Sequence, residues 1–219
     1  MPKPSSAETL TVRRRARPEG ANKAERRRTE IIAAAVKLFS ARGYSATSVN
    51  DIGEEVGLLP GSLYYHIRSK EDLLYEILLE LHTFALDEMN RVDAEGGDPV
   101  TRLRRLVRNH VINHDALRIR LFETEFHHLD EKRHAQILAM RKKYLAYVVK
   151  LIRKAQAEGL CDVGVNPDAV GLAILGLLNS MPQWFHSRGK ISIEQMADSV
   201  DRLVVGGLGA DPALLKQKP

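Results

Sequence analysis

The sequence predicts an all-α protein of about nine helices, and three observations support this fold class. Apolar residues recur at helical spacing along most of the 219 residues, and no stretch shows the alternation of a convincing strand. Successive apolar stripes begin at Ser, Asp or Asn and are separated by Gly or Pro, which are start and stop signals of helices. Apolar residues make 44% and charged residues 28% of the chain, as in ordinary globular proteins.

Four helices are expected in residues 22–84. Three of them begin with a capping residue and an acid three positions later, namely Asn22 with Glu25, Ser48 with Asp51 and Ser69 with Asp72. The third helix runs from Pro60 to about Ile67, since a first helical position does not need the N–H that proline lacks. Gly43 and Gly57 end the first two helices. The residues expected to face inward are Ile31, Ala35, Leu38, Phe39, Val49, Ile52, Val56, Leu73, Ile77, Leu81 and Phe84.

Five further helices are expected after Gly96 and Gly97. They begin at Asp98 with Pro99, at about Asp115, at Asp130, at Asn166 with Pro167, and at Ser192 with Gln195. The second of these runs to about His128 and the third to Glu158, because Gly159 ends it. The last helix fades at Gly206 and Gly207.

The positive charge of the chain lies in its N-terminal third. Residues 1–70 carry 13 Lys and Arg residues against 7 Asp and Glu residues, a net charge of +6, and the remaining residues carry 20 and 21, a net charge of −1. Residues 1–21, with the arginine run from Arg13 to Arg17, are expected to form a disordered arm. This distribution indicates that the N-terminal third approaches a polyanion, with a solvated basic tail as the alternative.

The second and third helices form a helix-turn-helix, a motif whose second helix lies in the major groove of DNA. If Leu63 and Ile67 point into the core, the step of about 100° per residue turns the intervening polar residues outward. The residues turned outward are Gly61, Ser62 and Tyr65. The glycine lets the backbone approach the bases, and both hydroxyls can donate and accept hydrogen bonds at base edges.

The flank of the same helix and the start of the next offer groups for the DNA backbone. Tyr64, His66 and Lys70 lie where phosphates would run. Lys70 also stands at a helix N-terminus, whose N–H groups attract anions. A buried aromatic cluster with a satisfied histidine is the alternative for Tyr64 and His66, because both residue types are often partly buried.

Residues 29–78 resemble the DNA-binding domain of the tetracycline-repressor (TetR) family. The segment reads TEIIAAAVKLFSARGYSATSVNDIGEEVGLLPGSLYYHIRSKEDLLYEIL. The residues at the family's spacing are Ala34, Leu38, Phe39, Gly43, Tyr44, Thr47, Val49, Ile52, Gly57, Leu63, Tyr64, His66, Lys70 and Leu73. The resemblance implies a helix-turn-helix domain at 22–68, a helical ligand-binding and dimerisation domain at 69–209, and a tail at 210–219.

The resemblance also implies roles at matching positions. The residues that would hold phosphates are Thr47, Tyr64, His66 and Lys70, and those that would meet base edges are Pro60, Gly61, Ser62 and Tyr65. Leu59 departs from the family, which usually has Ser or Thr as the cap; losing such a cap costs about 1 kcal/mol. We expect Leu59 to contact a thymine methyl instead. Selectivity would then depend on DNA shape and on arm arginines in a narrow minor groove.

The family's mode of action implies a homodimer on double-stranded DNA with a palindromic operator. One such unit reads too few base pairs alone, so half-sites about 34 Å apart are expected. The last two helices carry apolar stripes that would form the dimer interface, with an intramolecular core as the alternative. The stripes are Val170, Ile174, Leu177, Leu178, Met181 and Phe185, and then Met196, Val200, Leu203 and Val204.

The resemblance further implies a cavity for a small-molecule effector whose binding releases the DNA. The candidate lining residues, each of which is more often plain core, are Phe122, Phe126, Tyr144, Tyr147, Met181, Trp184 and Phe185. Residues 57–78 resemble actinobacterial members that govern lipid and sterol breakdown and respond to coenzyme A thioesters. We therefore expect a repressor released by a small hydrophobic ligand, and an acyl-CoA is the specific candidate. Cations for its phosphates would come from Arg118, Arg120, Arg141, Lys142 and Lys143, for which a solvated helix face is the alternative.

Other functions find less support in the sequence. An enzyme is not expected, because the chain has no phosphate loop, no G-x-S-x-G and no H-E-x-x-H, and no cofactor is expected either. A metal site is not expected at His110, His114, His127, His128 and His134, because satisfied or exposed histidines are commoner. A ligand-independent architectural DNA-binding protein stays open, although it would not need a large near-neutral body.

The expected location is the cytoplasm. No apolar run approaches the roughly 20 residues of a membrane span, and no apolar stretch follows the charged N-terminus as in a signal peptide. Cys161 is the only cysteine, so the sequence predicts no disulfide framework and suits a reducing compartment.

Overall fold

The computed structural model describes residues 23–113, 115–186 and 189–216. Across these ranges the chain forms nine α-helices and two short 3-10 turns, with no strand, which confirms the all-α prediction for them. The predicted arm at residues 1–21, the predicted cap Asn22 and His114 lie outside the described residues.

The N-terminal helices are α1 (Lys23–Arg42), α2 (Val49–Glu55) and α3 (Pro60–Leu63). α2 begins with the predicted capping box, in which the Ser48 hydroxyl accepts from the Asp51 N–H at 3.1 Å and the Asp51 carboxylate accepts from the Ser48 N–H at 2.6 Å. Gly57, at a φ of 66°, makes the turn from α2 toward α3, a conformation that glycine adopts without steric cost.

α3 is shorter than the predicted stretch to Ile67. After its first turn, the N–H groups of Tyr65 and His66 donate to carbonyls three residues earlier, which is the pattern of a 3-10 helix. The Ile67 N–H then returns to the α-helical pattern and donates to the Leu63 carbonyl at 3.1 Å. Leu59 is the N-cap and makes no side-chain capping bond, as its apolar side chain predicts.

Six helices make up the rest of the protein. They are α4 (Lys70–Glu95), α5 (Pro99–Ile112), α6 (Ala116–Glu125), α7 (Glu131–Ala157), α8 (Pro167–Trp184) and α9 (Ile193–Gly207). Each begins at a residue that the sequence predicts, and the capping side chains are those of Ser69, Asp98, Asp115, Asp130, Asn166 and Ser192. The predicted helix from Asp115 to His128 ends earlier and continues as the 3-10 turn Phe126–His128; a second turn, Pro212–Lys216, lies in the predicted tail.

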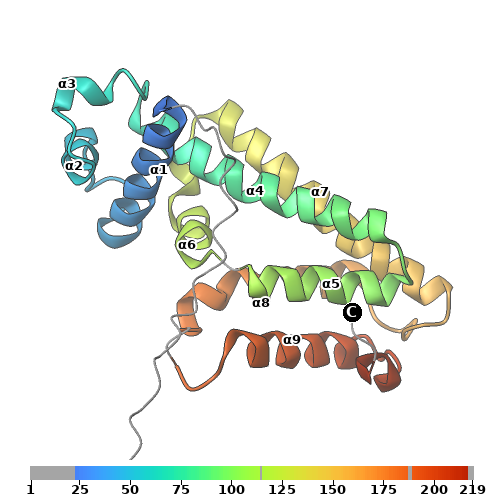
Figure 1. The fold of residues 1–219 in the computed structure, drawn as a ribbon. Coiled ribbons are helices and arrows are strands. Elements are labelled where there is room, and N and C mark those ends of the chain that lie inside the picture. Colours follow the sequence, from blue (N-terminus) through green and yellow to red (C-terminus); the bar gives the residue numbers. More distant parts are fainter. Residues whose placement is uncertain (1–22, 114, 187–188, 217–219) are drawn as a thin grey trace, which may run out of the picture.

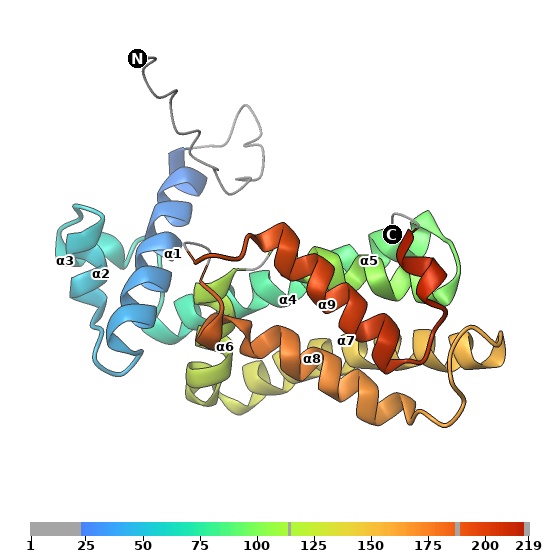
Figure 2. The same cartoon turned by 90° about the horizontal axis from the view of Figure 1, so that it is seen from below.

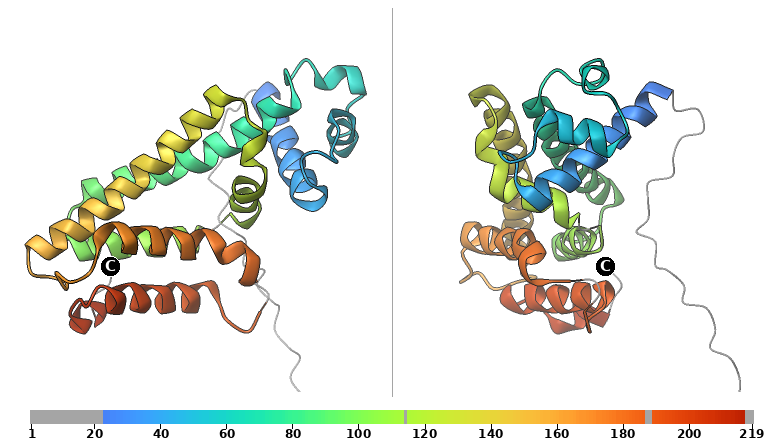
Figure 3. Two further views of the ribbon diagram at one scale, coloured as in Figure 1. Left: turned by 180° about the vertical axis from the view of Figure 1, so that it is seen from behind. Right: turned by 90° about the vertical axis from the view of Figure 1, so that its left-hand side faces the viewer.

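The long helix α4 connects the N-terminal group α1–α3 with the body of the protein (Figure 1). It runs beside α7, and below this pair α8 packs on α7 and α9 packs on α5 (Figures 1 and 3). Seen from below, α8 and α9 form the nearest layer of the body (Figure 2). α6 contacts α1 on one side and α8 on the other, so it bridges the N-terminal group and the body.

Two apolar clusters hold these helices together. The first joins α1–α3 to the start of α4 and also takes in Leu121 and Phe122 of α6 and Ile137 of α7. The second fills the space between the end of α4 and helices α5, α7, α8 and α9. Because the first cluster crosses residues 68 and 69, the predicted domain boundary does not coincide with a break in the core, and that boundary remains a prediction.

The apolar stripes predicted for a dimer interface lie mainly inside the chain's own core. The buried members are Ile174, Leu178, Met181, Phe185, Val200 and Val204. Leu203 of α9 is 61% exposed, and Leu172 of α8, which the prediction did not include, is 58% exposed. The intramolecular alternative therefore holds for most of each stripe, and the outward apolar residues are a different set.

A buried ion pair joins α5 to α9. The Arg104 Nε donates to one oxygen of the Asp201 carboxylate at 2.9 Å, and its Nη2 donates to the other at 2.8 Å. Both side chains are almost completely buried. This two-bond geometry matches the fork of the guanidinium group to the carboxylate, and it fixes the packing of α9 on α5.

Candidate DNA-binding surface and ligand cavity

α3 presents one face to solvent and packs the other into the first apolar cluster. Leu63 and Ile67 are buried as predicted, whereas Tyr65 is 90% exposed and Tyr64 is also exposed. The guanidinium group of Arg28 on α1 holds the end of this segment, because it donates both to the His66 carbonyl and to the Glu76 carboxylate of α4. The outward face of α3 is thus fixed relative to α1 and α4.

The residues predicted to meet base edges gather around this outward face. Leu59 is 77% exposed, and Pro60 opens the helix beside it. Gly61 is exposed, and apart from its chain neighbours and its own helix backbone no described atom lies within 4 Å of the place where a Cβ would stand. Ser62 is half-buried at the edge of the face. The arrangement leaves the backbone of α3 accessible to a groove of DNA. The base contacts themselves stay a prediction.

Thr47 and Lys70 have structural contacts that the sequence did not predict. Thr47 is fully buried, and its hydroxyl donates to the Gly43 carbonyl at 2.9 Å. The prediction that the Thr47 side chain holds a phosphate is therefore wrong, because that hydroxyl closes the loop after α1. The Lys70 Nζ donates to the carbonyls of Tyr44 at 2.9 Å and Thr47 at 3.0 Å and lies over the Tyr44 ring, so it fastens the same loop to α4.

Sequence reasoning overlooked one cation on this surface. Arg68 follows α3, is exposed, and has no ion pair or hydrogen bond within the described part of the chain. The half-buried His66 and the exposed Tyr64 stand just before it. An exposed guanidinium beside α3 is a suitable phosphate contact, and its signal in the sequence is its position between the predicted helix and the cap Ser69.

A partly open cavity of about 100 Å³ lies in the body, lined by residues of α4, α5, α6, α7 and α8 and of the connection between α5 and α6. Its apolar lining consists of Leu81, Phe84, Ala85, Leu106, Ile119, Phe122, Met140, Tyr144 and Leu175. Its polar lining consists of His82, Glu88, Asn109, His110, Asn113, Asp115, Arg141 and Asn179. A cavity of this composition suits a ligand with an apolar part and a few polar groups. A second hollow, lined by Arg120, Glu123, Thr124, Pro182 and Gln183, adjoins it at the shared residue Asn179.

Two of the seven residues predicted to line a cavity do so, namely Phe122 and Tyr144. Burial raises the pKa of the Tyr144 hydroxyl, and the nearby Glu88 carboxylate raises it further, so this group stays a protonated donor. Phe122 is only 4% exposed and also belongs to the apolar cluster of the N-terminal helices.

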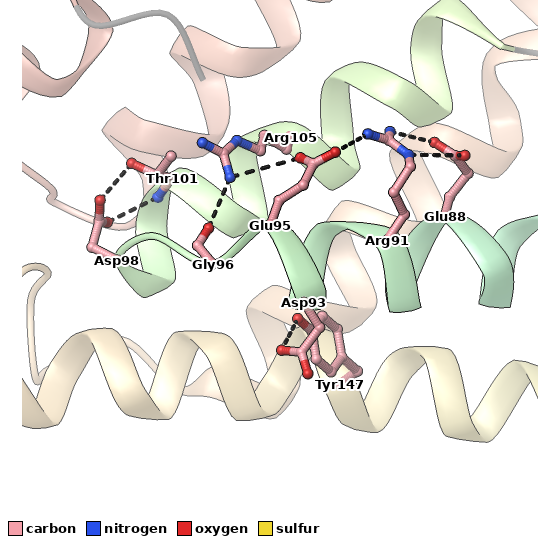
Figure 4. Close-up of polar contacts among 9 residues, drawn as sticks. All are labelled: Glu88, Arg91, Asp93, Glu95, Gly96, Asp98, Thr101, Arg105 and Tyr147. Carbon is pink, nitrogen blue, oxygen red and sulfur yellow. Dashed lines mark hydrogen bonds and ion pairs between the residues drawn. The ribbon is translucent and has the colours of Figure 1, made fainter.

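The predictions for Phe126 and Tyr147 are corrected by the structure. The Phe126 ring stacks on His134, with 4.0 Å between the ring centroids, and packs against Phe122 rather than lining the cavity. The Tyr147 hydroxyl donates to the Asp93 carboxylate at 2.7 Å at the far end of α4 (Figure 4). Burial and this bond raise the pKa of Tyr147 to about 12.

Met181, Trp184 and Phe185 do not line this cavity either, and a role for them in ligand binding stays a prediction. Met181 and Phe185 are buried in the second apolar cluster, where they pack between helices. Trp184 is 45% exposed, and its indole N–H donates to the Ser180 hydroxyl at 3.1 Å. The end of α8 therefore contributes Asn179 to the cavity and its aromatic residues to the core and the surface.

Sequence reasoning missed most of the polar lining. A usable signal was present in α8, where Asn179 is the first hydrogen-bonding side chain after ten residues of apolar helix. His82 on α4 and Asn109 on α5 interrupt apolar faces in the same way. Polar groups on an inward helix face need partners, so they often mark a site where a ligand supplies them.

His82 has a defined orientation in the cavity wall. Its Nδ1 lies 2.8 Å from the Leu78 carbonyl, so Nδ1 carries the proton and donates, and Nε2 is left as an acceptor. Its ring meets Phe122 edge-on at 4.7 Å between centroids. Burial lowers the pKa of His82 below its ordinary value, with Arg141 adding to the effect, so the ring is neutral near pH 7.

Acidification is expected to destabilise the protein partly through His82. Because burial lowers the pKa of His82, the unfolded chain binds more protons than the folded protein, and stability falls as the pH drops below about 6.5. We expect the melting temperature of His82→Gln to fall less than that of the wild type between pH 7.5 and 5.5. His127→Gln, which removes an exposed histidine, is the control and should keep the wild-type slope. Equal slopes for all three proteins would contradict the expectation.

Neither the requirements of a metal site nor those of a membrane span are met by the described residues. No group of three or more His, Cys, Asp and Glu side chains among them is arranged to hold a metal ion. His127 and His128 lie side by side, and His128 stacks on Tyr44 at 4.6 Å between centroids. Within the described ranges, each helix is too short or too polar to span a lipid bilayer.

Known proteins resemble the chain over most of its length. Residues 31–77 match the bacterial regulatory proteins of the tetR family, and residues 96–208 match the tetracyclin repressor-like C-terminal domain. The HTH-type transcriptional repressor KstR2 of Mycolicibacterium smegmatis is 25% identical over 185 residues, which cover 83% of this chain and 90% of the relative.

Two solved structures have the same arrangement of helices. The ketosteroid transcriptional regulator KstR2 of Mycobacterium tuberculosis superposes with a TM-score of 0.79 at 25% identity, covering 84% of this chain and 96% of that one. AibR in complex with isovaleryl coenzyme A and operator DNA superposes with a TM-score of 0.74 at 26% identity, covering 84% and 100%. The matches include both the helix-turn-helix and the helices around the cavity. The chain belongs to the tetracycline-repressor (TetR) family of bacterial regulatory proteins.

Proposed function

We propose that this protein is a homodimeric transcriptional repressor that binds a palindromic operator through α2 and α3 and leaves it when a small hydrophobic ligand enters the cavity. The observation that supports the ligand response is that Phe122 takes part in both the cavity and the N-terminal core. This residue lines the cavity and also belongs to the apolar cluster that holds α1–α3. A ligand that displaces Phe122 would therefore move the packing surface of the DNA-binding helices.

The proposed dimer uses the outward apolar residues of α8 and α9. Leu172 and Leu203 are more than half exposed, which favours their burial against a second copy of the chain. Gly176 and Gly206 are exposed, and apart from their own helix backbone and chain neighbours no described atom lies within 4 Å of their Cβ positions, so two helices can approach closely there. A symmetric pair would present two α3 helices to successive major grooves on one side of the DNA.

The specific effector that we propose is an acyl-coenzyme A thioester. AibR, with the same fold, was solved with isovaleryl coenzyme A and operator DNA. In this chain the cavity would take the acyl group, and the adjoining hollow with Arg120 and Gln183 would take part of the coenzyme. Repression is the proposed sign because KstR2 relatives are named repressors. The cytoplasm is the proposed location, because a protein that acts on operator DNA has to share its compartment.

Selection of binding sites from random double-stranded DNA by the purified full-length protein tests this function. We expect a palindrome to be enriched, with half-sites whose spacing fits two α3 helices. Adding hexanoyl-coenzyme A should then release the protein from that palindrome. Footprints of uniform protection, with no preferred sequence and no release, would favour the architectural alternative. Enrichment without release would retain the regulator and reject this effector.

A further inference from the structure

Of the charged residues that line the cavity, the two acidic ones have ion-pair partners within the protein. Glu88 is paired with Arg91, whose Nη2 lies 2.7 Å from the carboxylate (Figure 4). The Asp115 carboxylate lies 3.4 Å from the Nε of Arg118 and caps the start of α6. Both acidic side chains of the lining therefore already have a guanidinium partner, and neither calls for a cationic ligand.

Arg141 of α7 is in the opposite situation. No carboxylate of the described residues lies within ion-pair distance of its guanidinium group. The positions one turn away on α7 hold Ile137, Leu138, Tyr144 and Leu145, so its own helix supplies none. It is the one Lys or Arg among the described residues that line this cavity. His82 beside it is neutral near pH 7, so it neither repels nor replaces the Arg141 charge.

The position of Arg141 distinguishes it from an ordinary solvated cation. Its guanidinium carbon lies 5.2 Å from the centroid of the Phe122 ring, which holds the planar group against the cavity wall. Arg141 is exposed and Phe122 is buried, so the positive charge faces the solvent side and the apolar wall lies inside. Lys142 and Lys143 follow on α7 but do not line the cavity.

We propose that Arg141 is the anion-recognising residue of this cavity, and that the effector is an amphipathic anion. Its carboxylate or phosphate lies at Arg141, and its apolar part lies against Phe122, Leu106 and Leu175. The inference rests on the proposed ligand response and adds to it the residue that recognises the charge of the ligand. Because Arg141 stacks on Phe122, the bound anion also acts on the residue that joins the cavity to the N-terminal helices.

Calorimetric titration of three full-length proteins with three probes tests this assignment. The probes are hexanoate, hexanoyl-coenzyme A and uncharged 1-hexanol, which share one alkyl chain length. The proteins are the wild type, Arg141→Gln and Lys143→Gln, the last being the same chemical change outside the cavity. Arg141→Lys is the fourth protein if Arg141→Gln does not fold, because it keeps the charge and loses the planar fork.

We expect Arg141→Gln to bind at least one anionic probe about tenfold or more weakly, since a charge-assisted bidentate bond is lost. Binding of 1-hexanol by Arg141→Gln should stay at the wild-type level, and Lys143→Gln should bind all probes as the wild type does. A loss with hexanoate identifies a carboxylate site, and a loss with hexanoyl-coenzyme A alone identifies a phosphate site. In Arg141→Lys, the same selective loss supports the inference and unchanged anion binding overturns it.

Three results would overturn the inference and separate it from the proposed function. Unchanged anion binding by Arg141→Gln rejects the role of Arg141 and leaves the ligand response intact. Wild-type protein that binds 1-hexanol as tightly as both anions rejects an anionic effector but keeps a hydrophobic one. If the wild-type protein binds none of the probes, the inference and the ligand part of the proposed function are both overturned. Operator binding is measured without ligand, so the DNA-binding part of the proposed function is tested independently.

Discussion

Replacing Asp201 with alanine is expected to destabilise the protein by about 3–5 kcal/mol, the cost of breaking a buried ion pair by removing one of its members. Arg104 and Asp201 are both buried, and two hydrogen bonds of 2.9 and 2.8 Å join them between α5 and α9. Without the carboxylate, the buried guanidinium of Arg104 would lose both of these hydrogen bonds. Denaturant unfolding followed by circular dichroism measures the loss.

A neighbouring ion pair supplies the control for this experiment. Arg108 pairs with the exposed carboxylate of Asp198 at 2.5 Å on the same two helices. Asp198→Ala should cost less than about 1 kcal/mol, because exposed pairs contribute little. The double variant Arg104→Met with Asp201→Leu should recover most of the stability, since apolar residues can replace a buried pair. Equal losses for Asp201→Ala and Asp198→Ala would show that burial of the pair is unimportant.

Tyr65→Ala is expected to weaken operator binding by about 1–3 kcal/mol, or roughly 5- to 150-fold, without changing the melting temperature. The side chain is 90% exposed on the outward face of α3, so the folded protein loses almost no packing when it is removed. On the proposed operator, the same side chain would reach base edges in the major groove. Fluorescence anisotropy with the selected palindrome measures the affinity.

Two companion variants give this result its meaning. Tyr65→Phe keeps the ring and removes the hydroxyl, so a loss shared with Tyr65→Ala assigns the effect to a hydrogen bond at a base edge. Tyr147→Phe removes a hydroxyl at the far end of α4, where it bonds to Asp93, and should leave operator affinity unchanged. Wild-type affinity in Tyr65→Ala would remove this residue from the proposed DNA contacts.

Local sequence signals predicted the helices well because their causes are local. A capping side chain bonds within three residues of itself, so Ser48 with Asp51, and Ser192 with Gln195, can be recognised without knowing the fold. The shorter α3 was not predictable in this way. The N–H groups of Tyr65 and His66 bond three residues back, and the contact at this end of α3 comes from Arg28 of α1, which is distant in sequence and donates to the His66 carbonyl.

The cavity was harder to predict because its causes are distant along the chain. Helical spacing places Phe122 and Met181 on inward faces alike, but only packing of five helices determines that the first meets a void and the second meets side chains. Arg104 and Asp201 stand 97 residues apart, and no local pattern relates them. For Arg141 the sequence does contain an informative feature, because no acidic residue stands three or four positions away from it on its helix.

The apolar cluster that spans α1–α4, α6 and α7 also limits how the protein can be taken apart. A segment cut after residue 68 would leave Ile31, Phe39 and Leu63 facing water where α4, Leu121 and Ile137 now cover them. The DNA-recognition end is therefore not a portable module. Engineers who wish to graft it onto another regulator would have to transplant the matching surfaces of α4, α6 and α7 with it.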